Sequence, residues 1–245
     1  EPIYAIADHA SQFHDIFHTL SGARHFFFHL IYESLDTYRE SDVIVLLRVC
    51  ADGSKSFIYC YPIHIEIGLG KGQFITTLAQ MNPEINYIGI EMNSTVLLKA
   101  IRRYEQKAAE EGREPGGNLR FMRLDARLLE DCFAPGEVDR IYLNFSDPWP
   151  KDKNANKRLT SPMFLGRYRS VLKPGGVIEF KTDNRGLFDY SVETAKAEGW
   201  EILALTYDLH ADETMNAGNI ETEYEAKFSA KGNKIGKMII TYRGG

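Results

Sequence analysis

Through most of the chain, apolar and polar positions alternate in a pattern that predicts strands and helices in turn. Residues 63–67, IHIEI, place three isoleucines on one side of an extended segment and His64 and Glu66 on the other, which predicts a strand. The glycine-rich turn GLGKG follows at residues 68–72, and residues 73–81 are predicted to form a helix. Glycine tolerates positive φ and lets a ligand approach the backbone. This opening is therefore typical of a nucleotide-binding βαβ unit.

The same alternation continues along the rest of the sequence. Six further strands are predicted, at residues 86–90, 118–124, 138–145, 177–181, 202–207 and 237–242. Helices are predicted between them. One helix begins after Ser161, has Leu172 on its inward face and is ended by the PGG run at residues 174–176. Another helix ends near Gly199. The expected fold class is therefore α/β, with a seven-stranded, mostly parallel sheet and helices on both faces.

The first part of the chain, residues 1–61, does not share this alternation and predicts no function. Four histidines are spaced to share helix faces in pairs, His14 with His18 and His25 with His29. Such pairs can bind zinc or nickel, but no cysteine or acid has a matching spacing, so we expect amphipathic helical turns and no metal. Strands are predicted at residues 43–50 and 57–61. We expect an atypical N-terminal region of unknown role beside a domain formed by residues 62–245.

Residues that can bind or act on a ligand lie at or just beyond the carboxyl ends of the predicted strands, where ligands bind in sheets of this kind. These residues are Glu66, Gly68, Glu91, Asp125, Asp147 and Asp183. Glu91 stands 23 residues beyond Gly68, close to the spacing of about 20 at which dinucleotide folds place a ribose-binding acid. A redox enzyme of this fold would bind pyrophosphate at the glycine turn. Because three acids surround a turn whose only cation is Lys71, a cationic cofactor is the better electrostatic match.

One further stretch, SDPWP at residues 146–150, is stiffened by its two prolines. It holds Asp147 and Trp149 just beyond a predicted strand, and the indole can stack on a base or act as a packing anchor. Four cations follow within eight residues, Lys151, Lys153, Lys157 and Arg158. An acid, a flat aromatic ring and a cluster of cations suit a polar planar group on a phosphate chain. The alternative is a proline-rich turn followed by a solvated charged loop.

Composition narrows the class of protein. The chain is 44% hydrophobic and 26% charged, which suits a globular α/β protein. A formal net charge of −5 argues against indiscriminate binding of nucleic acid but allows a local basic patch. No apolar run is long enough to span a bilayer. Three cysteines without paired or metal-like spacing fit a reducing compartment, so we expect a cytoplasmic protein with no membrane association.

Five segments together resemble the bacterial type of the tRNA (guanine-N7)-methyltransferase family: HIEIGLGKGQFI, NYIGIE, VDRIYLNFSDPWPK, LKPGGVIEFKTDN and TEYEAKF. The resemblance covers residues 62 to about 242, and residues 1–61 do not match the short basic arm expected there. It implies a Rossmann-like methyltransferase fold with S-adenosyl-L-methionine as methyl donor. It further implies that tRNA is the partner, with a guanine of the variable loop as acceptor. No obligatory protein partner is expected, and the enzyme would be a monomer or homodimer.

The resemblance also implies roles for individual residues. Those implied to line the cofactor are Glu66, Gly68, Gly70, Glu91, Asp125 and Asp147, and Asp147 is also implied to be catalytic. Those implied to face the substrate are Lys151, Asp183, Thr222, Glu223, Tyr224 and Glu225. Guanine N7 carries a lone pair and no proton, so the reaction requires alignment and exclusion of water rather than a general base. Asp147 and Asp183 can accept hydrogen bonds from guanine, and their charge opposes the positive charge that develops on the ring.

Two other classes of function stay open on sequence alone. One is a methyltransferase that acts on a small molecule or a protein, against which the basic run after Asp147 argues. The other is a non-catalytic RNA-binding or scaffold protein that kept the fold. Such a protein would lose Asp147 or fill the glycine turn, and the sequence retains both.

Overall fold

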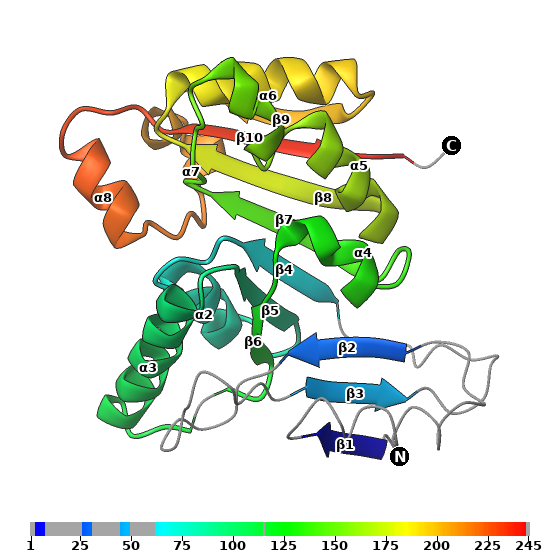
Figure 1. The fold of residues 1–245 in the computed structure, drawn as a ribbon. Coiled ribbons are helices and arrows are strands. Elements are labelled where there is room, and N and C mark those ends of the chain that lie inside the picture. The colour runs from blue at the N-terminus through cyan, green and yellow to red at the C-terminus, as the bar shows by residue number, and fades with distance from the viewer. Residues whose placement is uncertain (1–2, 8–25, 31–44, 50–61, 115, 244–245) are drawn as a thin grey trace.

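A seven-stranded sheet forms the centre of the computed structural model (Figure 1), which describes residues 3–7, 26–30, 45–49, 62–114 and 116–243. The elements from residue 62 onward are, in chain order, β4 (Ile63–Ile67), α2 (Gln73–Met81), β5 (Asn86–Glu91), α3 (Ser94–Glu110), β6 (Leu119–Arg123), η1 (Ala126–Leu128), α4 (Leu129–Cys132), β7 (Val138–Asn144), η2 (Asp152–Lys157), α5 (Pro162–Val171), β8 (Leu172–Thr182), α6 (Arg185–Ala197), β9 (Glu201–Thr206), η3 (Leu209–Ala211), α7 (Glu213–Asn216), α8 (Glu223–Ser229) and β10 (Gly236–Thr241). None of the described helices is both long enough and apolar enough to cross a bilayer.

The strand order of the sheet is β6-β5-β4-β7-β8-β10-β9. The first five strands in this order pair in parallel, and β10 pairs antiparallel with both of its neighbours. This arrangement confirms the predicted mostly parallel sheet. The chain builds outward from β4 through β5 to β6 and then returns to place β7 on the other side of β4. Such a reversal leaves a crevice beyond the carboxyl ends of β4 and β7.

The two faces of the sheet carry separate apolar cores, as the alternation along β7 shows. Ile141 and Leu143 pack in a core that includes the inward residues of α5 and α6. Tyr142, between them, packs in a second core with α2 and α3. Because successive side chains of a strand point to opposite faces, the helices cover both faces, as predicted. The packing of helices on both faces holds the strands, and therefore the residues at their carboxyl ends, in fixed positions beside the crevice.

All seven strands predicted between residues 62 and 245 are present, and the largest difference concerns the start of β8. Leu172, predicted on the inward face of the preceding helix, belongs to β8 and pairs with Val138 instead. The backbone at Leu172 is already extended, with φ −72° and ψ 141°, so the segment before Gly175 joins the ladder. The register then shifts between Val138 and Arg140. The PGG run therefore ends the helix, as predicted, but lies inside a longer strand.

The described residues of the N-terminal region form the strands β1 (Ile3–Ala7), β2 (Phe26–Leu30) and β3 (Val45–Val49), which pair antiparallel in the order β1-β3-β2. The strand predicted at residues 43–50 is confirmed as β3. The helical face predicted for His25 and His29 is wrong at His29, which lies in β2, a segment rich in strand-favouring aromatic residues. His14, His18, His25 and the strand predicted at residues 57–61 lie outside the described residues.

Candidate active site

The glycine turn after β4 is held against the end of β5. Gly68 and Gly70 have φ of 76° and 55°, a region that strains other residues. The amide of Gly68 donates to the carbonyl of Ile90 at 2.8 Å. A side chain at Gly68 would meet nothing within 4 Å, so open space lies in front of the turn. Glycine is therefore required here for its conformation, and the backbone stays accessible to a ligand.

Glu91, at the end of β5, is fixed beside this turn by backbone amides. Its Oε2 accepts from the amide of Gly70 at 3.3 Å, and its Oε1 accepts from the amide of Asn93 at 3.0 Å. Asn93 also caps α3 through its side chain. The spacing noted in the sequence thus brings the acid into contact with the glycine turn. Its carboxylate remains half-exposed and can accept further hydrogen bonds.

Glu66 is the most deeply buried acid of this crevice, with 2% of its surface exposed. Asn144, on the neighbouring strand β7, donates from Nδ2 to Glu66 Oε1 at 2.9 Å. The other oxygen, Oε2, is buried and has no hydrogen-bond partner among the described residues. Burial raises the pKa of Glu66 to about 8, and the hydrogen bond from Asn144 and the charge of Lys181 only partly oppose this shift. A buried carboxyl group with one free oxygen is suited to receive a donor or a cation.

Asp125, at the end of β6, makes closer local contacts than its predicted role requires. Its carboxylate caps η1 by accepting from the Arg127 amide at 2.9 Å and pairs with the Arg127 guanidinium at 2.5 Å. The hydrogen bond from Arg127 lowers the pKa of Asp125. Arg127 is itself exposed, so a ligand can displace it. Two apolar side chains nearby are exposed: Met92, which follows Glu91, and Leu128, which is the last residue of η1. The sequence pattern does not single out either of them.

The loop that carries Asp147 is strained and fixed at both ends. Phe145 and Trp149 have φ of 52° and 40°, which non-glycine residues rarely adopt. The amide of Phe145 donates to the carbonyl of Lys181 at 2.8 Å. Between these two residues, Asp147 is exposed and makes no hydrogen bond or ion pair within the described chain. Its carboxylate is therefore held in place by the backbone while its oxygens remain available.

Arg158 fixes the far end of this loop, which corrects its grouping with the surface cations. Only 8% of the residue is exposed. Its Nη2 donates to the carbonyl of Trp149 at 3.0 Å, its Nε donates to the carbonyl of Pro148 at 3.2 Å, and its guanidinium lies 4.2 Å from the ring centre of Tyr190. A loop with two prolines has few amides of its own, so its carbonyls need an external donor. The two prolines thus signal that some donor must reach this loop, but they do not show that the donor is Arg158.

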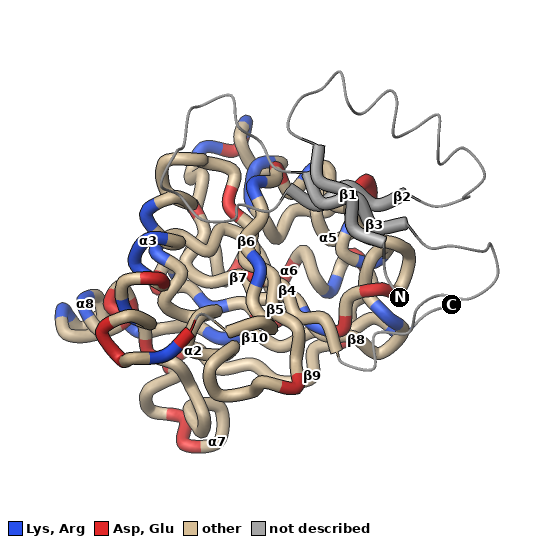
Figure 2. Tube along the Cα trace, turned by 90° about the horizontal axis from the view of Figure 1, so that it is seen from below, with Lys and Arg blue, Asp and Glu red and all other residues tan. Residues whose placement is uncertain are grey.

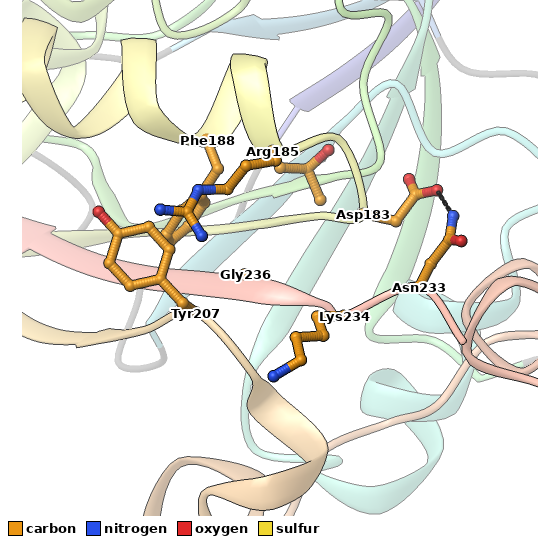
Figure 3. A pocket seen from close by; sticks show the side chains of 8 residues that line it. Asp183, Arg185, Phe188, Tyr207, Asn233, Lys234 and Gly236 are labelled. Atoms are coloured by element: carbon orange, nitrogen blue, oxygen red, sulfur yellow. Dashed lines mark hydrogen bonds between the residues drawn. The ribbon is translucent and has the colours of Figure 1, made fainter.

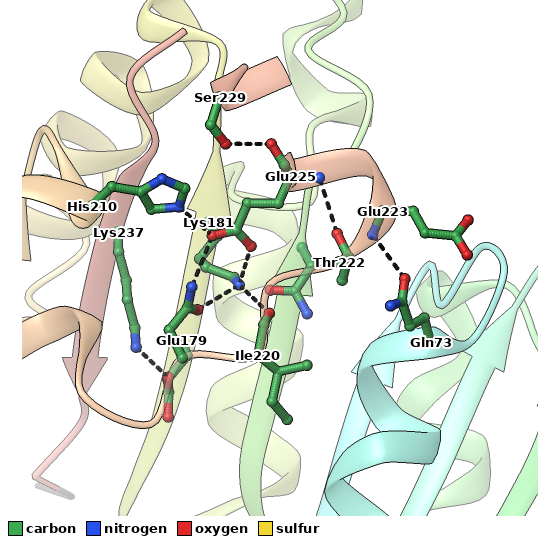
Figure 4. Close-up of polar contacts among 12 residues, drawn as sticks. Gln73, Glu179, Lys181, His210, Ile220, Thr222, Glu223, Glu225, Ser229 and Lys237 are labelled. Atoms are coloured by element: carbon green, nitrogen blue, oxygen red, sulfur yellow. Dashed lines mark hydrogen bonds and ion pairs between the residues drawn. The ribbon is translucent and has the colours of Figure 1, made fainter. Parts of the chain in front are cut away.

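Helix α8 is anchored on the sheet by a buried ion pair (Figure 4). Lys181 Nζ lies 2.7 Å from Glu225 Oε2, and both side chains are almost completely buried. Glu225 Oε1 accepts from Asn219 at 2.9 Å and lies 3.0 Å from Nε2 of His210. Burial acts to raise the pKa of Glu225, but the charge and hydrogen bond of Lys181 outweigh it and leave the pKa lowered. Glu225, predicted to face a substrate, points into the protein and holds α8 in place.

Two other residues of the predicted substrate run also make internal contacts. Thr222 caps α8 by accepting from the amide of Glu225 at 3.1 Å. The amide of Glu223 donates to Gln73 Oε1 at 2.8 Å, as Figure 4 shows, and its carboxylate pairs with Lys71 at 3.4 Å and with Arg103. The hydrogen bond from Arg103 lowers the pKa of Glu223. Glu223 therefore links α8 to the glycine turn and to α3.

Tyr224 is the residue of this run that connects α8 to the strand ends. Its ring centre lies 4.9 Å from that of Phe145 and 4.3 Å from that of Phe228. Its hydroxyl donates to Asp183 Oδ1 at 3.5 Å. Burial raises the pKa of Tyr224, and the charges of Asp183 and Asp147 act in the same direction. The structure thus brings Tyr224, Asp183 and the Asp147 loop together, next to the β4 and β5 ends that carry Glu66 and Glu91. Lys151, four residues after Asp147 in the chain, is exposed.

Comparison with known proteins identifies the family. A family model described as "Putative methyltransferase" matches residues 61–238. The tRNA (guanine-N(7)-)-methyltransferase of Lachnoclostridium phytofermentans is 56% identical over 178 residues, which are 73% of this chain and 79% of that protein. The enzyme of the same name from Bacillus subtilis is 47% identical over 182 residues, 74% of this chain and 81% of that protein. The crystal structure of the 16S rRNA methyltransferase KamB shares the fold, with a TM-score of 0.56 and 14% identity over 75% of this chain and 89% of that chain. The chain therefore belongs to the tRNA (guanine-N7)-methyltransferase family.

Proposed function

We propose that the protein transfers a methyl group from S-adenosyl-L-methionine to N7 of a guanine in the variable loop of tRNA. The proposal rests above all on Asp147, an exposed carboxylate that has no hydrogen-bond or ion-pair partner among the described residues and lies on a loop held in place by Arg158. The names of the relatives, all tRNA (guanine-N(7)-)-methyltransferases, support the same reaction. Asp183 and the hydroxyl of Tyr224 lie next to this loop and complete a polar wall.

The residues around the glycine turn fit S-adenosyl-L-methionine. The buried Oε2 of Glu66, which has no hydrogen-bond partner in the part of the chain that the structure describes, suits a cationic group, because ionising Glu66 without one is unfavourable. Glu91, oriented by two backbone amides, is suited to accept from the ribose hydroxyls. Met92 and Leu128 offer apolar surface for adenine, and the backbone at Gly68 is open. Asp125 can contribute once Arg127 moves aside. When bound, the cofactor supplies an activated methyl group.

On the acceptor side, the residues of this chain orient the guanine rather than remove a proton. Asp147 and Asp183 can accept hydrogen bonds from the N1–H and the amino group of guanine, which places N7 toward the cofactor. Their negative charge opposes the positive charge that develops on the base during attack. Arg158 and the positive φ values hold Asp147 in position before the substrate arrives. Alignment of two reactants can supply about 7–11 kcal/mol of the barrier.

A local excess of cations supports tRNA as the partner of an otherwise acidic chain. Figure 2 shows Lys and Arg along α3 and at α8. The exposed cations on the glycine turn, α3 and α8 and in the segment after them include Lys71, Arg102, Arg103, Lys107, Lys227 and Lys231, and Lys151, Lys153 and Lys157 follow the Asp147 loop. The net charge of −5 is therefore unevenly distributed. A phosphate backbone can bind these cations without general attraction to the whole protein.

A labelling experiment tests the proposal. The protein is incubated with tritiated S-adenosyl-L-methionine and unmodified tRNA, and the RNA is digested to nucleosides. Label is expected in 7-methylguanosine alone. A transcript with 7-deazaguanosine at the acceptor position lacks the attacking atom and is expected to remain unlabelled. Label in another nucleoside, or none in tRNA, would overturn the proposed function.

Replacing Glu91 with Ala is expected to weaken binding of the cofactor by about 1–3 kcal/mol, because charge-assisted hydrogen bonds to ribose are lost. Calorimetric titration of the folded variant with S-adenosyl-L-methionine measures this change. Glu84→Ala is the matched control, since Glu84 is an exposed acid before the start of β5, at the opposite end of that strand. Equal affinities for Glu91→Ala and wild type would exclude Glu91 from the cofactor site.

Replacing Lys151, Lys153 and Lys157 together with Ala is expected to flatten the salt dependence of tRNA binding. Each lost phosphate contact should reduce the slope of log K against log salt by about 0.7–0.9. Arg158 is left intact because it supports the loop. The control replaces three exposed cations at the opposite end of the strands, Lys173, Lys196 and Arg243. A slope that changes equally in both triple variants would show that these lysines have no specific role.

A further inference from the structure

A separate pocket of about 350 Å³ lies at the carboxyl end of β8, on the side of β10 (Figure 3). Its lining includes Asp183, Arg185, Tyr207, Asn233 and Lys234. These residues come from the end of β8, the start of α6, the segment after β9 and the segment before β10. Glu66, Glu91 and Asp147 do not line it. The pocket is therefore distinct from the cofactor crevice and shares only Asp183 with the candidate acceptor site.

One wall of this pocket is a flat, cationic surface. The guanidinium of Arg185 lies 4.1 Å from the ring centre of Tyr207, as Figure 3 shows. Asp189 accepts from Arg185 Nε at 2.9 Å, and the ring centres of Phe188 and Tyr207 lie 5.0 Å apart with their planes at 80° to each other. Arg185 is thus fixed by its neighbours while most of its side chain remains exposed. Planar guanidinium and aromatic groups are the surfaces on which unpaired bases stack.

The opposite wall carries a second cation. Lys234 is exposed and pairs with Asp208 at 3.0 Å, a surface contact that a phosphate can replace. The floor is closed by tight packing, because a Cβ on Gly236 would come within 2.7 Å of the Phe188 ring. The three acids around the pocket, Asp183, Asp189 and Asp208, each have a partner in the protein. Asp189 and Asp208 are themselves the partners of Arg185 and Lys234, so a phosphate would bind through the donors that these exposed pairs leave over, the Nη groups of Arg185 and the remaining ammonium protons of Lys234.

Asp183 connects this pocket to the candidate acceptor site. Its Oδ2 accepts from Asn233 at 3.0 Å on the pocket side, and its Oδ1 accepts from Tyr224 at 3.5 Å on the side of the Asp147 loop. In the sheet, β8 lies between β7, which leads to Asp147, and β10, which follows the pocket. Two strand spacings are about 10 Å. Bases of neighbouring nucleotides in a single-stranded loop can be splayed apart, which would let one strand reach both sites.

We propose that this pocket binds a nucleotide that flanks the target guanine on the same tRNA strand. Its base stacks on the Arg185–Tyr207 pair, and its phosphate lies between Arg185 and Lys234. The inference rests on the proposed function and adds a second subsite to it. The pocket would thereby favour a guanine whose neighbour is unpaired, since only an unpaired base can turn out of the RNA and stack in the pocket while the guanine fills the active site.

A double-mutant cycle between protein and RNA tests this subsite. The protein variants are Arg185→Gln, which alters an exposed side chain, and Tyr207→Ala. The RNAs are the unmodified transcript and transcripts with an abasic residue at each position next to the target guanine. With the unmodified transcript, each variant is expected to raise the KM for tRNA about 5- to 100-fold, from lost stacking, while kcat and cofactor affinity stay near wild type. With one abasic transcript, wild type and variants are expected to converge.

Arg243→Gln is the matched control, because Arg243 is an exposed arginine at the opposite end of the strands. Wild-type KM values for both pocket variants would overturn the subsite, and the proposed function would stand as long as wild type still labels guanine N7. A defect that persists with every abasic transcript would also overturn the base-binding subsite, since it would show contact with the backbone alone. A change in cofactor affinity would assign the pocket to the cofactor instead.

Discussion

Replacing Asp147 with Asn is expected to lower single-turnover methyl transfer about a hundredfold or more, by analogy with loss of one preorganised electrostatic contact. Asn keeps the size of the side chain but removes the charge and exchanges an acceptor oxygen for a donor. Because Asp147 has no partner within the described chain, its loss should not change the thermal melt. A positioning group acts mainly in the transition state, so cofactor affinity should change less than the rate.

Thermal melts beside single-turnover rates separate this role from a structural one. Asp152→Asn is the matched control, since Asp152 is an exposed acid at the start of η2, just beyond the loop. It should transfer methyl groups at the wild-type rate. A destabilised but fully active Asp147→Asn enzyme would mean that the carboxylate only supports the turn and that the active site lies elsewhere.

The second large effect concerns the dependence of cofactor affinity on pH, through Glu66. The pKa of this buried carboxyl is raised to about 8, so it is mostly protonated at pH 6. A cationic ligand binds the ionised form, and binding must therefore release a proton. Affinity is expected to rise about tenfold per pH unit between pH 6 and 7.5 and to level off above 8. Glu66→Gln keeps an oxygen for the hydrogen bond from Asn144 and should abolish this dependence while weakening binding.

Calorimetry in buffers of different ionisation enthalpy measures the released proton. The ammonium of the cofactor titrates in the same range, and comparison with Glu66→Gln isolates the carboxyl because both proteins bind the same ligand. Stability gives an independent check. The folded pKa lies above the unfolded value near 4.5, so the stability of wild type should fall as pH rises from about 4.5 to 8. Glu66→Gln should lack that fall. Parallel pH profiles for the two proteins would exclude Glu66 as the titrating group.

The sequence predicts the sheet and the strand-end acids because both depend on local patterns. Short apolar segments bounded by turn residues, with clear alternation at residues 63–67, located all seven strands, and the connection order of a βαβ fold then places Glu66, Glu91 and Asp147 at one edge. The start of β8 was missed because pairing with Val138 is a tertiary effect that acts across a helix. Likewise, the aromatic strand β2 overrode the histidine spacing at His29.

Charged residues were the main source of error, because their burial depends on partners that no local pattern identifies. Arg158 reads as part of a basic surface run, yet its guanidinium satisfies loop carbonyls about ten residues earlier in the chain. Glu225 reads as a surface acid, yet it pairs with Lys181 from a strand 44 residues away. The pocket at Arg185, Tyr207 and Lys234 is assembled from three segments and leaves no motif. Pattern reasoning finds where a site must be, and long-range pairing decides which side chains face it.

The position of β10 has a consequence for synthesis of the protein on the ribosome. β10 is the last strand described, and it lies between β8 and β9 in the sheet. Until it emerges, the nascent chain carries β8 with an open edge and β9 without the strand that pairs with it in the finished sheet. Exposed strand edges are where growing chains mispair with one another. The complete sheet thus forms only after β10 has been synthesised, because β10 joins β8 to β9. A chain released by a ribosome that stalls before Gly236 would lack β10 and the pairing of β8 and β9 with it.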